Sequence, residues 1–413
     1  MQRLPALTSF NSSETEQIDE GGNPPSLLQP PLFNEKVSFP QLETLIICDI
    51  GSTTLWNQQV IANSFYKLRV IEILECHKLK CLFTSFMSNA FSSLVEIEVS
   101  ECSLLETLVL SGGAEFSKLY SLTLQRLPAL ISFSSSEIEQ IDEGGNPPSL
   151  LQAPLFNEKV SFPQLETSRI CDIGSTTLWN HQVVANSFYK LRVIKVQECH
   201  KLKCLFTTSM SKAFSSLTKI EVSECSLLKT LVLSQGVEFF ELYSLTMHRL
   251  PALTSFSSSE TEQIDEGGNP PSLLQAPLFN EKVSFPQLET LIICDIGSTT
   301  LWNQQVIANS FCKLSVIEVQ QCHKLKCLFT SFMSNAFSSL AEIEVSECSL
   351  LETLVLSGGA EFSELYSLTL QRLPALISFS SSETEQIDEG GNPPSLLQAP
   401  LFNEKVSFPN WRH

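Results

Sequence analysis

The sequence lacks the features that would direct the chain into or across a membrane. No hydrophobic run approaches the roughly 20 residues that a membrane-spanning helix needs. The first ten residues, MQRLPALTSF, contain no apolar segment of the kind found in signal peptides. A single glycosylation sequon is present, at Asn11. These absences disfavour an extracellular receptor, and we expect a cytoplasmic protein that does not bind membranes.

The sequence also lacks the cysteine pattern of a disulfide-bonded protein. The chain has 13 cysteines, an odd number, and their spacing follows an internal repeat rather than a disulfide framework. We interpret them as reduced thiols in a cytosol-like compartment.

Signatures of catalysis and of nucleotide binding are absent. The sequence contains no G-x-x-x-x-G-K-[ST], G-x-S-x-G, H-E-x-x-H or C-x-x-C motif. We therefore predict that the chain is not an enzyme, and we assign it no catalytic residues and no cofactor.

Two segments deserve comparison with metal sites. Cys76, His77 and Cys81 lie within six residues, but a closed zinc site needs four ligands and no second Cys/His pair lies nearby. The acidic segment at residues 19–23 lacks the alternating oxygen ligands of a calcium loop. We predict no metal site in either segment.

The net charge of −19 is concentrated in a recurring acidic segment. Its first copy contains Glu14, Glu16, Asp19 and Glu20, and three further copies bring the total to sixteen carboxylates. None of the four segments contains a lysine or an arginine. The rest of the chain is nearly neutral, and an acidic protein is a poor ligand for phosphate backbones. We expect no nucleic-acid partner.

What the sequence has in abundance is repetition. SFPQLET begins at Ser38, Ser161 and Ser284, in steps of 123 residues. The chain is thus predicted to be one array over residues 1–413, with units 1–123, 124–246 and 247–369 and a partial unit 370–413. Serine, acids, Gly-Gly-Asn and Pro-Pro predict disordered acidic inserts near residues 11–31, 134–154, 257–277 and 380–400.

A shorter period lies inside each unit. The template F-x-x-L-x-x-L-x-L-x-x-C-x-x-L starts at Phe65, Phe91 and Phe116, and more weakly at Phe39, in steps of 25 or 26 residues. Apolar residues that alternate in L-x-L are typical of a strand, and one short strand cannot bury its apolar side alone. Stacked turns would form a parallel sheet over a continuous core, with the template phenylalanines in a second buried stripe.

The strings LFNEKVSFPQLETL, LWNQQ and FSSL-x-x-IEVSECSLLE resemble the leucine-rich-repeat region of plant intracellular immune receptors, the coiled-coil nucleotide-binding disease-resistance (NBS-LRR) proteins. The resemblance covers essentially the whole chain. It implies an α/β-type solenoid, a horseshoe with a parallel sheet on the concave face and irregular or short helical turns, such as residues 85–90, on the convex face. The implied function is protein recognition in defence, with a pathogen effector, a host protein or the receptor's own nucleotide-binding switch domain as partner.

The sequence departs from that family in having no P-loop. It also begins and stops within a repeat, since Met1 occupies the place of Leu124 and Leu370. The alternative to a recognition module is therefore a free-standing scaffold, a decoy or a truncated receptor fragment without signalling activity.

Residues between the buried strand positions are expected to form a partner-binding surface, because they point away from the core. Four of the ten differences between the first and third units fall at such places, which fits either a diversified binding face or relaxed surface positions. The candidate binding residues are Arg69, Glu72, Glu75, Glu96, Glu98, Arg192, Lys195, Glu198, Lys219, Glu221, Ser315, Glu318, Gln321, Glu342 and Glu344.

Two further features lead to expectations about packing. Trp56, Trp179 and Trp302 follow the weakest template match, and packing on the rim of the solenoid is favoured over a role as interface anchors. Ser168 replaces a leucine at a predicted buried strand position. We expect the turn that starts at Phe162 to be the least stable for that reason.

Overall fold

A computed structural model of the chain shows two compact units, Met1–Cys199 and His200–His413. No helix occurs in the part of the chain that it describes, so no helix there could cross a membrane. The described residues are 2–4, 31–34, 37–56, 65–84, 91–110, 114–135, 154–157, 160–179, 187–207, 214–233, 237–258, 277–280, 283–302, 310–330, 337–356, 360–381 and 406–407.

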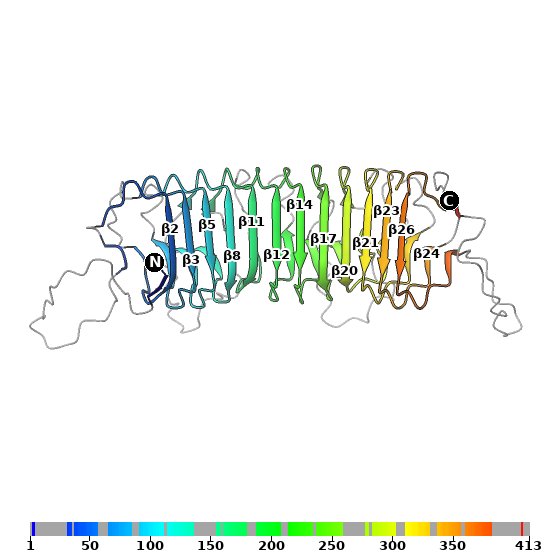
Figure 1. Cartoon of the computed structure of the whole chain (residues 1–413), viewed down its shortest axis with the longest axis horizontal. Helices are drawn as coiled ribbons and strands as arrows, with labels where there is room; N and C mark the ends of the chain where they lie inside the picture. Colours follow the sequence, from blue (N-terminus) through cyan, green and yellow to red (C-terminus); the bar gives the residue numbers. More distant parts are fainter. Residues whose placement is uncertain are drawn as a thin grey trace, which may run out of the picture. The chain divides into compact units, whose positions relative to one another are not determined.

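The first unit is built on a parallel sheet whose strands lie side by side in the order β1-β2-β3-β5-β8-β11-β12 (Figure 1). Each strand comes from a successive turn of the chain, so every neighbouring pair is parallel and in register. The strands are Gln2–Leu4 (β1), Thr44–Ile50 (β2), Val70–Leu74 (β3), Glu96–Ser100 (β5), Ser121–Leu127 (β8), Thr167–Ile173 (β11) and Val193–Gln197 (β12).

The second unit repeats this arrangement in the order β14-β17-β20-β21-β23-β26. The pairs are again parallel and follow the sequence period. The strands are Lys219–Ser223 (β14), Ser244–Leu250 (β17), Thr290–Ile296 (β20), Val316–Gln320 (β21), Glu342–Ser346 (β23) and Ser367–Gln371 (β26).

The alternation of side chains along most core strands confirms the predicted template. In β3, Ile71 and Ile73 are completely buried, whereas Val70, Glu72 and Leu74 are partly exposed on the other side. The template cysteine Cys76 and the leucine that follows, Leu79, are also completely buried. The core is therefore a set of ladders of equivalent apolar residues, one per turn, as the period predicts.

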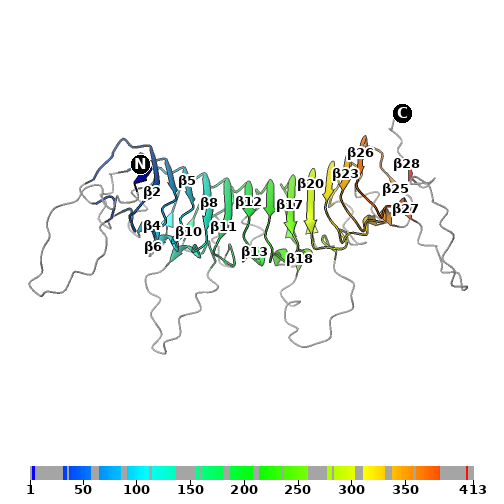
Figure 2. The same ribbon diagram turned by 60° about the horizontal axis from the view of Figure 1, so that its bottom comes forward.

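The return segments differ from the prediction of irregular or short helical turns. Behind the main sheet they form a second layer of short parallel strands (Figure 2). In the first unit these strands are Cys81–Thr84 (β4), Thr107–Leu110 (β6) and Ser132–Ser135 (β9). In the second unit they are Cys204–Thr207 (β13), Thr230–Leu233 (β15) and Ser255–Ser258 (β18), and Cys327–Thr330 (β22), Thr353–Leu356 (β24) and Ser378–Ser381 (β27).

The physical reason for this second layer is the length of each turn. A turn of about 26 residues must cross the core in both directions, and a strand advances about 3.3 Å per residue against 1.5 Å for a helix. The buried hydroxyl of Thr107 donates hydrogen bonds to the carbonyl oxygens of Val109 (3.2 Å) and Phe133 (3.3 Å), which satisfies polar groups inside this layer. The return segment at residues 85–90 lies outside the described residues.

Short two-residue strands complete the fold. They pair in parallel with one another, in two-stranded sheets that are separate from the main sheet and the second layer. They are Ala114–Glu115 (β7) with Val160–Ser161 (β10), Val237–Glu238 (β16) with Val283–Ser284 (β19), and Ala360–Glu361 (β25) with Val406–Ser407 (β28).

Aromatic rings fill the space between the two layers. The template phenylalanines Phe65 and Phe91 are buried with ring centroids 6.0 Å apart. Trp56, only 2% exposed, stacks on Phe33 at 5.0 Å and meets the edge of Phe65 at 4.9 Å. Trp179 and Trp302 are similarly buried, so the three tryptophans pack in the core rather than on the rim as expected, and none is exposed as an interface anchor.

The acidic inserts lie almost entirely outside the described residues. Ser134, at the start of one predicted insert, is described and is buried in β9. Ser257 and Ser380 occupy the equivalent buried places in β18 and β27, so the second layer extends slightly into the segments that were predicted as inserts.

Candidate functional site

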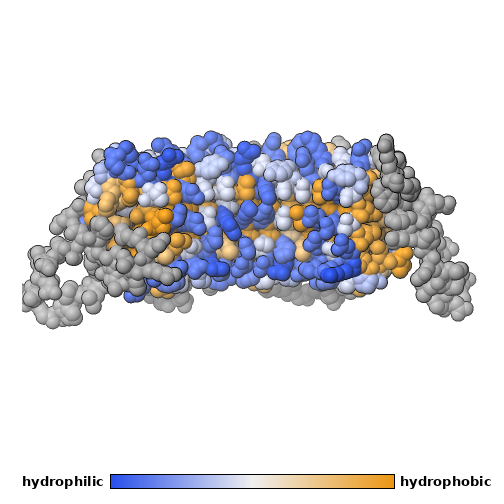
Figure 3. Space-filling view, viewed as in Figure 1, coloured by the Kyte–Doolittle hydropathy of each residue, from blue (hydrophilic) through white to orange (hydrophobic). Residues whose placement is uncertain are grey.

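The main sheet of each unit presents a face of strand side chains that point away from the core, which we call the outward face. It consists of three rows, formed by the first, third and fifth residues of each core strand. The central row of the first unit contains Ile46, Glu72, Glu98, Thr123, Arg169 and Lys195, which are register partners from strand to strand. In each unit this face mixes hydrophilic and hydrophobic side chains, with hydrophilic ones along the edges where strands begin and end (Figure 3).

Nine of the fifteen candidate binding residues lie on the outward face. They share the first or third place of a strand, and most are half-buried between their neighbours. They are Glu72, Glu96, Glu98, Lys195, Lys219, Glu221, Glu318, Glu342 and Glu344.

The other six candidates lie beyond the strand ends rather than on the face. Arg69, Arg192 and Ser315 immediately precede β3, β12 and β21. Glu75, Glu198 and Gln321 immediately follow the same strands with φ between 53° and 54°, in the left-handed region. The structure therefore narrows the predicted surface, because each of these strands is only five residues long and the left-handed residue turns the chain away.

Carboxylates crowd together on the outward face of the first unit. Glu72 on β3 lies directly opposite Glu98 on β5, and Glu96 lies two residues before Glu98 on the same strand. Partial burial raises the pKa of Glu98 above its usual value, and the negative charges of Glu72 and Glu96 raise it further. Arg169, on β11, lowers that pKa through its positive charge and thus opposes the shift.

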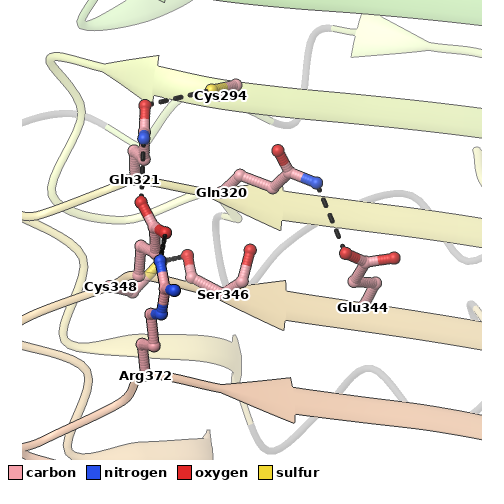
Figure 4. Close-up of polar contacts among 8 residues, drawn as sticks. Cys294, Gln320, Gln321, Glu344, Ser346, Cys348 and Arg372 are labelled. Carbon is pink, nitrogen blue, oxygen red and sulfur yellow. Dashed lines mark hydrogen bonds and ion pairs between the residues drawn. The ribbon is translucent and has the colours of Figure 1, made fainter.

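The same crowding recurs in the second unit. Glu318 on β21 lies opposite Glu344 on β23, and its pKa is raised by partial burial and then by Glu344 and Glu342. Gln320 donates a hydrogen bond to Glu344 (3.4 Å), and the hydroxyl of Tyr366 donates one to Glu342 (Figure 4 shows the first contact).

The middle repeat has a lysine in place of one of these carboxylates. Lys219 stands where the first and third repeats have Glu96 and Glu342. Its ammonium group lies 2.6 Å from the carboxylate of Glu221 on the same strand, and that hydrogen bond raises the pKa of Lys219.

Sequence reasoning missed a polar ladder at the edge where the strands end (Figure 4). Gln321 donates to Glu347 (2.8 Å), and Arg372 donates to the other carboxylate oxygen of Glu347 (2.5 Å). Cys294 lies at 3.8 Å from the side-chain oxygen of Gln321. The first unit has the equivalent pair of Arg126 and Glu101 at 2.5 Å.

The signal for this ladder was present in the sequence as opposite charges 25 residues apart at equivalent template positions. All its members except the cysteine have positive φ, so the ladder runs along the left-handed residues that end the strands. Arg372 is 80% exposed and Glu347 is 34% exposed, and ion pairs that are this open to solvent add little to stability.

The segment considered for zinc does not form a ligand cluster. Cys76 is buried and donates a hydrogen bond to the carbonyl oxygen of Leu74 (3.3 Å), while His77 is exposed beside Ser103 (3.5 Å). Burial raises the pKa of Cys81. Within the described ranges no group of three or more His, Cys, Asp or Glu residues could hold a metal ion.

Comparison with known families agrees with the repeat architecture. The family model of leucine-rich repeats of RPS2-like plant disease resistance proteins matches residues 41–141, 164–266 and 286–388. The three matches follow the 123-residue period, and together they cover most of the chain. A search of curated proteins found no match to the chain. With its stacked parallel turns and these three matched blocks, the chain belongs to the leucine-rich repeats of RPS2-like plant disease resistance proteins.

Proposed function

We propose that this chain is a protein-recognition module of a plant disease-resistance receptor, and that it binds its partner through the outward face. The observation that carries the proposal is the outward face itself. It is a set of in-register rows that mix polar and charged side chains with apolar ones, and the chain belongs to a family of disease-resistance repeats. Repeat surfaces of this kind bind through extended contact rather than in a deep pocket.

The partner in this proposal is a protein in the cytoplasm: a pathogen effector, a host protein or the nucleotide-binding switch domain of a longer receptor. Preferential contact with one conformation of the receptor would shift its equilibrium towards that conformation. The proposal includes no enzymatic activity, no cofactor, no nucleic acid and no membrane. Turnover of ATP, GTP or a nitrophenyl ester by the purified chain would contradict that part of it.

Site-specific photo-crosslinking tests the location of binding. One variant carries p-benzoylphenylalanine at Thr123, in the central row of the outward face on β8. A matched control carries it at the exposed Glu106, which immediately precedes β6 in the second layer. The probe protein is a purified nucleotide-binding domain from the same receptor family.

The proposal predicts a crosslinked adduct from Thr123 and little from Glu106. Unlabelled chain should compete for the Thr123 adduct. Equal adducts from both positions, or an adduct from Glu106 alone, would show that the outward face is not the recognition surface.

A further inference from the structure

The outward face of the first unit has an acidic half. Glu72, Glu96 and Glu98 occupy neighbouring places on β3 and β5. None of the three forms an ion pair with another described residue. Carboxylates that repel one another and are partly desolvated gain most when a cation approaches them.

The same face has a basic half two strands further on. Arg169 on β11 and Lys195 on β12 are register partners in the central row. The guanidinium of Arg169 is exposed and forms no ion pair with another described residue. Its positive charge nevertheless lowers the pKa of Glu98.

The basic half is specific to the middle repeat. Position 169 is isoleucine in the first and third repeats, at Ile46 and Ile292, and position 195 is glutamate, at Glu72 and Glu318. Each of the two exchanges adds positive charge at the central row. In the second unit, the two strands before the acidic half, β20 and β17, have the uncharged residues Ile292 and Thr246 in the central row.

A neutral strand separates the two halves. β8 contributes Ser121, Thr123 and Gln125 to the outward face, which can form hydrogen bonds but carry no charge. Three strand spacings of about 4.8 Å separate the middle of the acidic half from the middle of the basic half, which gives a distance of about 14 Å.

We propose that the outward face of the first unit binds a segment of a partner protein that carries two oppositely charged clusters about 14 Å apart. Lysine or arginine side chains of the partner lie over Glu72, Glu96 and Glu98, and its aspartate or glutamate side chains lie over Arg169 and Lys195. A uniformly basic or acidic ligand would be attracted by one half and repelled by the other. The inference rests on the proposed function, because it names the chemistry of the partner at the same surface.

Designed peptides serve as probes for this chemistry. The two-block peptide is an alanine-based helix with three glutamates near its N-terminus and three lysines near its C-terminus, with block centres about ten residues apart because a helix rises 1.5 Å per residue. Two single-block peptides replace one block with glutamine. Binding to the full chain is measured by fluorescence anisotropy at low ionic strength, where exposed charges are least screened.

The matched variants come from the chain's own repeats. Arg169→Ile with Lys195→Glu installs the residues of the first and third repeats, so the fold is expected to tolerate both. Lys118→Glu is the control, because residue 118 is an exposed position outside the outward face and is glutamate in the other two repeats. It changes the net charge by the same amount as Lys195→Glu.

The two-block peptide should bind the unchanged protein about tenfold more tightly than either single-block peptide, as expected for several exposed charge pairs acting together. Arg169→Ile with Lys195→Glu should remove that advantage, whereas Lys118→Glu should retain it. Equal affinity for the two-block and lysine-only peptides, or an advantage that survives the double exchange, would overturn the inference.

The crosslinking experiment separates this inference from the proposed function. If the partner crosslinks at Thr123 but the two-block peptide shows no advantage, the face recognises proteins by other chemistry and the inference fails alone. If Thr123 yields no adduct, the proposed function fails as well.

Discussion

Ser168 on β11 lies directly opposite Leu122 on β8, and both side chains are completely buried. The serine hydroxyl has no hydrogen-bond partner among the described residues. The equivalent places in the other repeats hold Leu45 and Leu291. A ladder of apolar side chains is thus interrupted by one unsatisfied polar group, as expected from the sequence.

Replacement of Ser168 by leucine should therefore stabilise the protein. It removes a buried hydroxyl without a partner, which costs about 1–3 kcal/mol, and it fills the place with the side chain used in the other repeats. Denaturant unfolding of Ser168→Leu and Ser168→Ala measures the effect. Leucine should give the larger gain, since alanine removes the hydroxyl without filling the space.

The reverse exchange is the matched control. Leu291→Ser should cost about 2–5 kcal/mol, in the range of large-to-small core substitutions. Hydrogen exchange should find the amides of β11 less protected than those of β20 in the unchanged protein. Equal protection of the two strands would contradict the prediction that the turn starting at Phe162 is the weakest.

The template predicted the main sheet because strand alternation depends on local residue type. The positions of Ile71, Cys76 and Ser168 could all be assigned from the period alone. The second layer could not, since a four-residue segment such as Thr107–Leu110 is too short for alternation to identify it. The left-handed residues were missed because glutamate, aspartate or arginine occupies most of them, and no glycine marks the turn.

The candidate surface was predictable in part for the same reason. Residues inside strands, such as Glu72 and Glu98, were placed correctly by alternation. Residues at the ends, such as Glu75, depend on where the strand stops, which sequence patterns define poorly.

A close approach between consecutive turns gives a second prediction. A Cβ atom added to Gly174 would lie 2.4 Å from the carbonyl oxygen of Pro128, and one added to Gly297 would lie 2.3 Å from that of Pro251. Both contacts involve backbone, so the turns would have to separate. Each Gly→Ala exchange should cost about 1–3 kcal/mol, as other overpacked sites do.

Thermal unfolding of the two single variants and the double variant checks this prediction. The sites are far apart in sequence and share no contact residue, so their effects should add. Ser92→Ala, at an exposed turn, provides a neutral comparison. Unchanged melting of Gly174→Ala would show that the turns can separate without loss.

The cysteines should differ sharply in reactivity. Cys48 and Cys312 are partly exposed, and the other eleven are buried. Burial, followed by the charge of Glu198, raises the pKa of Cys171 to about 11, so this thiol stays protonated near pH 8. A thiol reagent applied to the native protein should therefore modify two residues rapidly, and the others only on unfolding.

Exchange of the two reactive positions tests the assignment. Cys312→Tyr installs the residue of the first and second repeats, Tyr66 and Tyr189, and Cys48→Ala removes the other thiol. The double variant should lose the rapid phase. A rapid phase of unchanged amplitude would place the accessible thiols elsewhere.

Glu98 and Glu318 should make the protein more stable at mildly acidic pH than at neutral pH. The folded-state pKa of Glu98 and that of Glu318 are raised above the ordinary value of 4.5, so the folded state retains these protons after the unfolded state has lost them. Their contribution to the free energy of unfolding therefore falls as the pH rises from 4.5 through the raised values. Above that window, each ionised glutamate faces a like charge directly opposite, which costs about 0.2–1 kcal/mol per pair.

The variant that combines Glu98→Gln with Glu318→Gln should thus be more stable than the unchanged protein at pH 7, and the difference should disappear below pH 4.5.

Glu347 provides the opposite case, because hydrogen bonds from Gln321 and Arg372 lower its pKa. Its contribution is present above pH 4.5 and is lost as the pH falls through the lowered folded-state value, so Glu347→Gln should be less stable at pH 7. Denaturant unfolding from pH 3 to 8 should show differences of opposite sign for the two variants. Differences of the same sign would mean that like-charge crowding on the outward face does not determine the pH dependence.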